Sequence, residues 1–203
     1  MMTAMAVALP DFGPHRVIVS LPSADTDDLV AACEVLWQER LRTWALPVAQ
    51  LDQLAALRAL FGRRATFGVA GLTSATQAAP AIDAGAAFLA APRAVPGLGA
   101  AGMVVPVILG GLTPSELMVA HELGATAVQV VPCEALEAAY AAALPKLVDG
   151  VPIIATGELT PESARNWLAG GAVGVWTTGL ATRDRVADVD LDGLRAACRP
   201  WQL

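Results

Sequence analysis

The chain has 203 residues, of which 55% are hydrophobic and 16% are charged, a composition that favours one compact globular domain over residues 1–203. Its formal net charge of −6 and its single lysine, Lys146, argue against a nucleic-acid partner, because phosphate backbones are bound by clustered Lys and Arg. Gly and Pro interrupt the apolar runs before the roughly 20 residues that a membrane-spanning helix needs. We therefore expect no membrane segment.

The three cysteines, Cys33, Cys133 and Cys198, are far apart and show no spacing typical of a zinc site or a disulfide framework. This usage indicates a reducing compartment. Since the N-terminus also lacks the basic start of a signal peptide, we expect a cytoplasmic protein. His121 shares no metal-ligand spacing with carboxylates. We therefore expect neither a metal nor another cofactor.

Apolar, β-branched runs alternate with helical patterns along the chain, after a lead at residues 1–15 that we expect to be irregular. Thr113 and Thr160 are each followed by Pro, and acidic residues stand in the next positions, which is typical of helix starts. The expected strands are residues 16–21, 41–46, 66–70, 87–91, 104–109, 125–131, 151–155 and 171–176. The expected helices begin near residues 26, 47, 73, 96, 113, 134, 160 and 190.

Eight strands in alternation with helices, spaced about 20 to 30 residues apart, predict a parallel sheet. Closing that sheet into a (β/α)8 TIM barrel removes its edges. An open doubly wound sheet is the alternative fold. No Gly-x-Gly-x-x-Gly follows the first strand, so the pattern of a dinucleotide fold is missing and we predict the barrel.

Several phrases, in order, resemble the 2-keto-3-deoxy-6-phosphogluconate/4-hydroxy-2-oxoglutarate aldolase family. They are residues 85–92, which are similar to a fourth strand ending in Ser-Pro-Gly, residues 106–118, which are similar to a fifth strand with its Ser-Glu-Leu-Met helix, and residues 155–162. The resemblance covers residues 16–182. It implies a small (β/α)8 barrel, often a trimer, whose lysine forms a Schiff base with a keto acid and releases pyruvate.

The resemblance places an amide where that lysine would stand. Aligning Pro132 and Glu134 with the family phrase Lys-Phe-Phe-Pro-Ala-Glu puts Gln129 on the lysine. An amide nitrogen is delocalised into its carbonyl and forms no imine. Lys146, after the following helix, is expected at the opposite end of the barrel. The Schiff-base mechanism is therefore not expected.

The family glutamate on the second strand, in Glu-Val-Thr-Leu-Arg-Thr, is also replaced. Matching residues 41–43 to Leu-Arg-Thr puts Gln38 at that position, whereas a register shifted by about one helical turn puts Arg42 there. Neither register supplies a carboxylate. Arg42 could instead hold a ligand carboxylate or pair with Glu39 or Glu134.

The phosphate-binding loops implied by the resemblance differ too, because Glu158 stands where a second glycine is expected. Its charge disfavours a phosphorylated ligand, which leaves a small carboxylate or sugar-like molecule as the expected partner. Glu134 is the acid/base candidate at the mouth, and Cys133 is a less favoured nucleophile. The expected ligand-binding residues are Arg42, Pro92, Gly110, Gln129, Thr156, Gly157, Thr177, Thr178 and Gly179.

Three functions follow from these substitutions. The first is a repurposed or non-catalytic barrel that binds a small carboxylate or sugar-like ligand. The second is a carbon–carbon lyase that uses other residues. The third is a structural or regulatory subunit that packs beside an active barrel. We expect the chain to form a homo-oligomer, with a trimer as the state that the resemblance implies.

Overall fold

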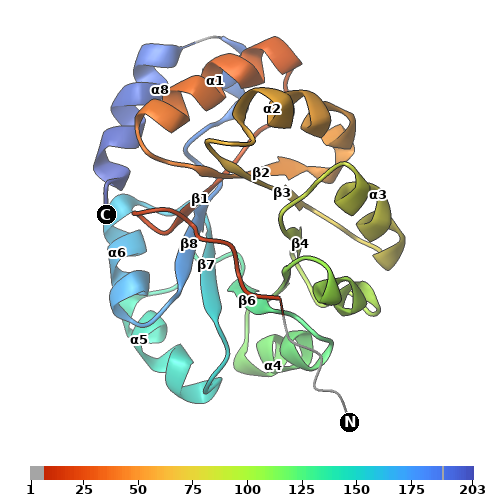
Figure 1. Ribbon diagram of the computed structural model, residues 1–203. Helices are drawn as coiled ribbons and strands as arrows, with labels where there is room; N and C mark the ends of the chain where they lie inside the picture. The colour runs from red at the N-terminus through yellow and green to blue at the C-terminus, as the bar shows by residue number, and fades with distance from the viewer. Residues whose placement is uncertain (1–6, 189) are drawn as a thin grey trace.

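Each apolar run predicted as a strand pairs in parallel with the next, and the last strand returns to the first, which closes the barrel (Figure 1). The computed structural model describes residues 7–188 and 190–203. The prediction of a (β/α)8 barrel is thus confirmed. The strands are β1 (Val17–Ser20), β2 (Thr43–Pro47), β3 (Thr66–Ala70), β4 (Leu89–Ala91), β5 (Val107–Gly111), β6 (Ala127–Val130), β7 (Ile153–Gly157) and β8 (Gly174–Thr177).

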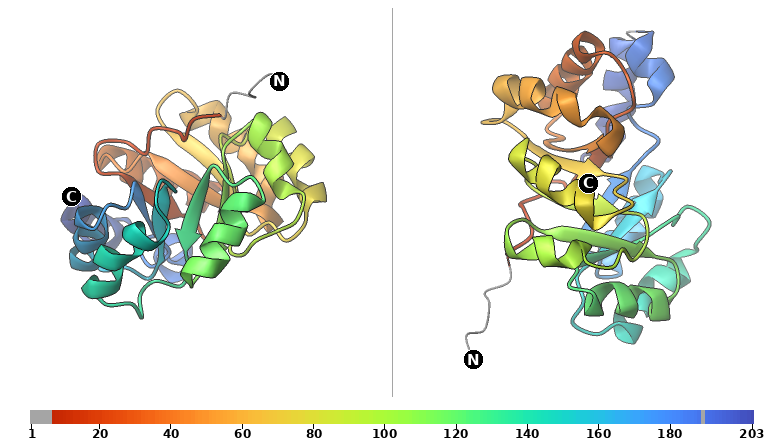
Figure 2. Two further views of the ribbon diagram at one scale, coloured as in Figure 1. Left: turned by 90° about the horizontal axis from the view of Figure 1, so that it is seen from below. Right: turned by 90° about the vertical axis from the view of Figure 1, so that its right-hand side faces the viewer.

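The helices lie outside the strands, as the further views in Figure 2 show. The α-helices are α1 (Thr26–Gln38), α2 (Leu54–Phe61), α3 (Ala78–Asp83), α4 (Pro114–Glu122), α5 (Ala138–Leu147), α6 (Pro161–Ala169), α7 (Arg183–Ala187) and α8 (Leu191–Cys198). The 3₁₀ helices are η1 (Val48–Gln53), η2 (Ala75–Gln77), η3 (Leu98–Met103) and η4 (Arg199–Trp201). Within the described ranges, no helix combines the length and the apolar character needed to cross a membrane.

The predicted helix starts at Thr113 and Thr160 are confirmed. The Thr113 hydroxyl accepts from the Glu116 backbone N–H at 3.3 Å, and the Glu116 carboxylate accepts from the Thr113 backbone N–H at 2.8 Å. Thr160 accepts from the Ser163 backbone N–H. These bonds satisfy N–H groups that have no partner inside their helix.

Two helical segments differ from the sequence expectation. α5 begins at Ala138 instead of residue 134, because residues 131–137 form an irregular turn between β6 and the helix. α7 has only five residues and shows too little periodicity to be predicted. Residues 7–15 contain no helix or strand, and the rest of the expected irregular lead lies outside the described residues.

Strand alternation divides the apolar side chains into two layers. One layer faces the helices, and the other fills the inside of the barrel. The inner layer consists of Phe12, Ile18, Ala45, Phe88, Ala90, Ile108, Ala127, Ile154 and Trp176. Phe12 comes from the lead and lies against Gly174, the first residue of β8, so it packs at the amino-terminal end of the barrel.

Gly68 makes room for the largest side chains of the inner layer. A Cβ added there would lie 2.2 Å from ring atoms of Phe88. Phe88 in turn meets Trp176 edge to face, with ring centroids 6.0 Å apart. The glycine on β3 is therefore required by packing inside the barrel.

We expect Gly68→Ala to lower the free energy of unfolding by about 1–3 kcal/mol, because the added methyl overpacks the barrel interior. Urea unfolding measures the loss. Gly179→Ala is the matched control, since a Cβ there would make only ordinary contacts, 3.7 Å or more from Glu158. The contact is confirmed if the double variant Gly68→Ala/Phe88→Leu loses less unfolding free energy than the two single variants lose in sum. It is contradicted if the two losses simply add.

Candidate active site

A small cavity of about 180 Å³ opens among residues at and beyond the carboxyl ends of the strands, where barrels of this kind carry their sites. Six different strands contribute lining side chains, so the barrel itself holds the cavity in shape. No charged side chain lines it. The lining residues are Ser20, Ala70, Gly71, Ala90, Pro92, Gln129, Val131, Thr156, Trp176 and Thr178. We call it the mouth cavity.

Gln129, which the resemblance aligns with the family lysine, lies on β6 with only 4% of its surface exposed and lines the mouth cavity. Its Nε2 donates to the Ala91 carbonyl at 2.7 Å. This bond links β6 to β4 across β5, whose residue level with Gln129 is Gly110. Among the described residues none donates to the Gln129 Oε1, so this oxygen is the polar atom that the amide leaves for a ligand.

Thr156 on β7 is the second polar side chain of the cavity, with 5% of its surface exposed. Its Oγ1 is buried and has no hydrogen-bond partner within the described part of the chain. A buried hydroxyl without a partner costs about 1–3 kcal/mol. A ligand hydroxyl or a water molecule in the cavity would remove that cost.

Trp176 and Ser20 form one wall of the cavity. The Trp176 Nε1 donates to the Ser20 Oγ at 2.8 Å, which satisfies the indole N–H inside the barrel. Thr178, just past β8, also lines the cavity, and so does Pro92, just past β4.

The placement of Gln38 and Arg42 at the mouth is wrong. Gln38 is the last residue of α1, where its Oε1 accepts from Arg195 at 2.6 Å. Arg42 is exposed and precedes β2, so it lies at the amino-terminal end of the barrel. The helix runs farther than either register assumed, and a turn with Arg40 at a φ of 64° separates it from the strand.

No carboxylate occupies the inward positions of β2. Ala45 belongs to the inner layer, and alternation turns Thr43 and Pro47 to the same side. Glu39 pairs with Arg195 of α8 at 3.6 Å instead. In the described geometry, β2 therefore directs no carboxylate into the barrel.

Thr177 was expected to contact a ligand, but it does not line the mouth cavity. It follows the inward-facing Trp176 on β8, so alternation turns its side chain to the helices. Its Oγ1 is buried and unpaired among the described residues, like that of Thr156, but on the other side of the sheet. The hydroxyl that reaches the cavity from this segment is that of Thr178.

Glu134, the acid/base candidate, is exposed and does not line the mouth cavity. Its Oε2 accepts from the Glu158 backbone N–H at 3.3 Å, and a Cβ on Gly157 would lie 1.9 Å from the same oxygen. Gly157 and Gly179 are therefore neighbours of the two glutamates and do not line the cavity. The carboxylate is directed at the loop after β7.

Cys133 is completely buried, and burial, reinforced by the negative charge of Glu134, raises the pKa of its thiol to about 12. The thiol is neutral at physiological pH and is a poor nucleophile. The described residues contain no group of three or more His, Cys, Asp or Glu side chains placed to hold a metal ion.

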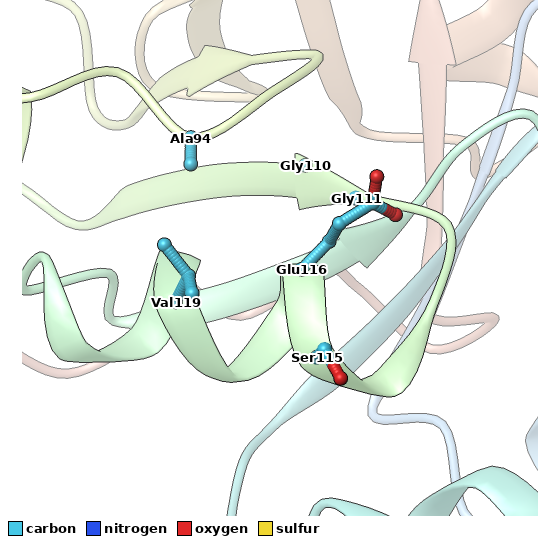
Figure 3. Close-up of a pocket in the computed structure, with 6 residues that line it drawn as sticks. All are labelled: Ala94, Gly110, Gly111, Ser115, Glu116 and Val119. Atoms are coloured by element: carbon cyan, nitrogen blue, oxygen red, sulfur yellow. The ribbon is translucent and has the colours of Figure 1, made fainter.

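A second cavity, of about 330 Å³, lies outside the barrel beside β5 and α4 (Figure 3). Glu116 is its only ionisable lining residue, and its carboxylate already accepts from the Leu112 and Thr113 backbone N–H groups. Those bonds lower the pKa of Glu116. Although this cavity is the larger one, its ionisable group caps a helix. The lining residues are Ala94, Gly110, Gly111, Ser115, Glu116 and Val119.

The closed parallel barrel, with a cavity at the carboxyl ends of its strands, defines a TIM-barrel protein. The sequence pattern of the family described as "KDPG and KHG aldolase" matches residues 13–195. The chain belongs to this family.

Solved structures share the fold. One called native KDPGal superposes with a TM-score of 0.84 at 19% identity, covering 96% of this chain and 95% of that one. A 4-hydroxy-2-oxoglutarate/2-dehydro-3-deoxyphosphogluconate aldolase from TTHB1 gives 0.77 at 26% identity, covering 93% of each chain. The KDPG aldolase of Legionella pneumophila, captured with pyruvate as a covalent carbinolamine, gives 0.78 at 19% identity, covering 91% of this chain and 92% of that one. No curated protein matches the chain.

We expect Cys133 to resist alkylation in the folded protein, because the thiolate forms only as the pH approaches its pKa of about 12. Iodoacetamide at pH 8, followed by peptide mass analysis, measures this. The same treatment in urea should label all three cysteines. Rapid modification of Cys133 in the native protein would contradict its burial.

Proposed function

We propose that this member of the KDPG and KHG aldolase family binds a small, uncharged, hydroxyl-bearing molecule in its mouth cavity without forming a Schiff base. The observation that carries the proposal is Gln129, whose amide nitrogen donates to the Ala91 carbonyl at the position that the resemblance gives to the lysine. An amide nitrogen is not a nucleophile towards a ketone. The side chain is therefore a contact and not a covalent catalyst.

No other lysine of the sequence is placed to do the work of the family lysine. Lys146, the single lysine of the sequence, is exposed in the last turn of α5 and precedes β7, so it lies towards the amino-terminal end of the barrel. An imine with a keto acid would require an amine inside the mouth cavity, and its lining residues include none. This argues against the alternative of a lyase with ordinary Schiff-base chemistry.

The lining also favours an uncharged ligand over the small carboxylate that the sequence left open. A carboxylate in a confined apolar cavity needs a cation or several N–H donors. Arg42, the expected partner, is at the other end of the barrel. Arg93, which follows Pro92, is exposed and donates to the Thr73 carbonyl at 3.5 Å. The sugar-like class is therefore the one we retain.

Two unpaired oxygens suit the ligand hydroxyl. The Thr156 Oγ1 can donate and accept, and the Gln129 Oε1 can accept. A volume of about 180 Å³ is below the roughly 300 Å³ at which drug-sized pockets begin, so the ligand is a short polyol or a molecule of similar size.

We also propose that the protein forms a homo-oligomer in the cytoplasm. Val119 and Leu112 are apolar and exposed beside the second cavity, which favours burial against another copy of the chain. The homo-oligomer, with a trimer suggested by the family resemblance, and a cytoplasmic location suited to free cysteines both agree with these features.

Incubation with pyruvate and borohydride should leave the mass of the protein unchanged, because no lysine lies in the mouth cavity. Intact-protein mass spectrometry measures the result. Gln129→Lys is the positive comparison, in which an adduct would report an amine placed where a keto acid can reach it. A pyruvyl adduct on the unaltered protein would overturn the proposal.

Thr156→Val should weaken the binding of erythritol about tenfold or more, because it removes a hydrogen bond inside the cavity. Thr177→Val is the matched control: it removes a buried, unpaired hydroxyl from the outer face of the neighbouring strand. Calorimetric titration measures both. We expect neither variant to be less stable than the parent, since neither hydroxyl has a partner to lose.

Equal losses of affinity in the two threonine variants would contradict the assignment of Thr156 to the site. Absence of erythritol and glycerol binding to the unaltered protein would contradict the ligand class.

A further inference from the structure

Ser20 is a lining residue of the mouth cavity whose hydrogen-bonding direction is set by the protein itself. Strand alternation turns Ser20 to the same side as Ile18, two residues earlier, and Ile18 belongs to the inner layer. Ile18 is level with Trp176 on β8, the strand beside β1 (Figure 1). From there the Trp176 Nε1 donates to the Ser20 Oγ at 2.8 Å. Ser20 therefore faces inwards at the carboxyl end of β1.

The indole ring of Trp176 is held on two sides. Phe88 meets it edge to face, with ring centroids 6.0 Å apart, and Ser20 accepts from its N–H. Gly68 leaves the space that Phe88 occupies, since a Cβ there would lie 2.2 Å from the ring. Only 2% of the Trp176 surface is exposed, although the residue lines the mouth cavity. Packing therefore fixes the direction from which Ser20 receives a hydrogen bond.

A serine hydroxyl that accepts from a fixed N–H still has its own proton to donate. The indole N–H is the one hydrogen-bond partner that the described residues give the Ser20 hydroxyl. The bond from the indole also makes this hydroxyl a stronger donor, because hydrogen bonds in a chain polarise one another. Ser20 therefore offers the mouth cavity a donor of defined direction.

The polar groups of the mouth cavity form a donor side and an acceptor side. Gln129 on β6 uses its amide nitrogen for the Ala91 carbonyl, so its Oε1 is left to accept. Ser20 on β1 is left to donate, and β7 and β8 separate the two strands. Thr156 lies between them on β7, where its unpaired Oγ1 can do either. A ligand that satisfies both sides accepts at one oxygen and donates from another.

Carbon atoms line the cavity between these polar groups. The Trp176 indole lies next to Ser20, and Ala70, Ala90 and Val131 also line the cavity. A polyol carries C–H groups between its hydroxyls, and their burial against apolar side chains is favourable. A molecule with a single oxygen would satisfy only one of the two sides.

We propose that Ser20 is a specificity-determining residue of the mouth cavity. Its hydroxyl, oriented by the Trp176 indole, donates to one oxygen of the ligand while the Gln129 Oε1 accepts from another. The inference rests on the proposed function and narrows its ligand class to small molecules with at least two oxygens, such as glycerol and erythritol. It also assigns the donor to a residue that the sequence did not single out.

The Trp176 indole N–H gives a readout in the unaltered protein. Erythritol should shift its NMR signal, because a ligand bonded to the Ser20 hydroxyl polarises the oxygen that accepts from the indole. The signal that is lost in Trp176→Phe assigns it. Trp44 is the internal control, since its Nε1 donates to the Leu41 carbonyl at 2.7 Å in the layer that faces the helices. The Trp44 signal should not move.

Ser20→Ala should weaken erythritol binding about tenfold, because the ligand loses a hydrogen bond. Ser115→Ala is the matched control, since Ser115 lines the second cavity. Calorimetric titration measures both. Ser20→Ala also leaves the indole N–H without its acceptor and should be less stable, but the indole shift is measured on the unaltered protein and does not depend on this variant.

The ligand 1,2-dimethoxyethane tests the direction of the bond, because it has two acceptor oxygens and no hydroxyl. It should bind the unaltered protein and shift the Trp176 signal, and Ser20→Ala should weaken its binding about tenfold. Dimethoxyethane binding that Ser20→Ala leaves unchanged would overturn the inference, as would a Trp176 signal that neither ligand moves.

The two ligands together separate this inference from the proposed function. Equally tight erythritol binding by Ser20→Ala and Ser115→Ala would refute the role of Ser20 and leave the proposed function intact. An indole shift with dimethoxyethane, without binding of erythritol or glycerol, would support donation by Ser20 and refute the hydroxyl-bearing ligand.

Discussion

Closure of the parallel sheet is the constraint on which the rest of this molecule depends. Because strand side chains alternate and the closed barrel has no free edge, the phase of each strand decides which residues enter the interior. Large inward side chains are then possible only beside very small ones. Gly68 beside Phe88, and Phe88 against Trp176, show how bulk just before β4 and on β8 is balanced by its absence on β3.

The same alternation of side chains along each strand decides that the mouth cavity is lined by apolar groups and a few polar atoms. Gln129 and Thr156 face inwards on neighbouring strands, whereas Thr177, one residue past an inward tryptophan, faces the helices. In an apolar setting each polar atom matters more, because water does not compensate for a missing partner. The Gln129 amide meets this demand on its nitrogen side through Ala91 and leaves its oxygen to the cavity.

The fold could be predicted because eight apolar runs and well-marked helix starts such as Thr113 repeat the same pattern. The position of Gln129 could be predicted because Pro132 and Glu134 anchor its register. The second strand could not, since Leu-Arg-Thr at residues 41–43 matches the family phrase but lies at the strand's amino-terminal end. The short motif shows which residues are similar to the family, but the start of β2 depends on where α1 ends. No sequence signal revealed that Glu134 accepts from the Glu158 N–H.

Gln129 is one of several features that distinguish this site from one suited to Schiff-base chemistry. Schiff-base chemistry needs an amine, a group that moves protons and a place for the anionic end of the substrate. In this barrel the first position holds an amide bonded to Ala91, and the described inward positions of β2 include Ala45 and no carboxylate. The two features are compatible, because an amide that needs no proton transfer suits a strand without an acid.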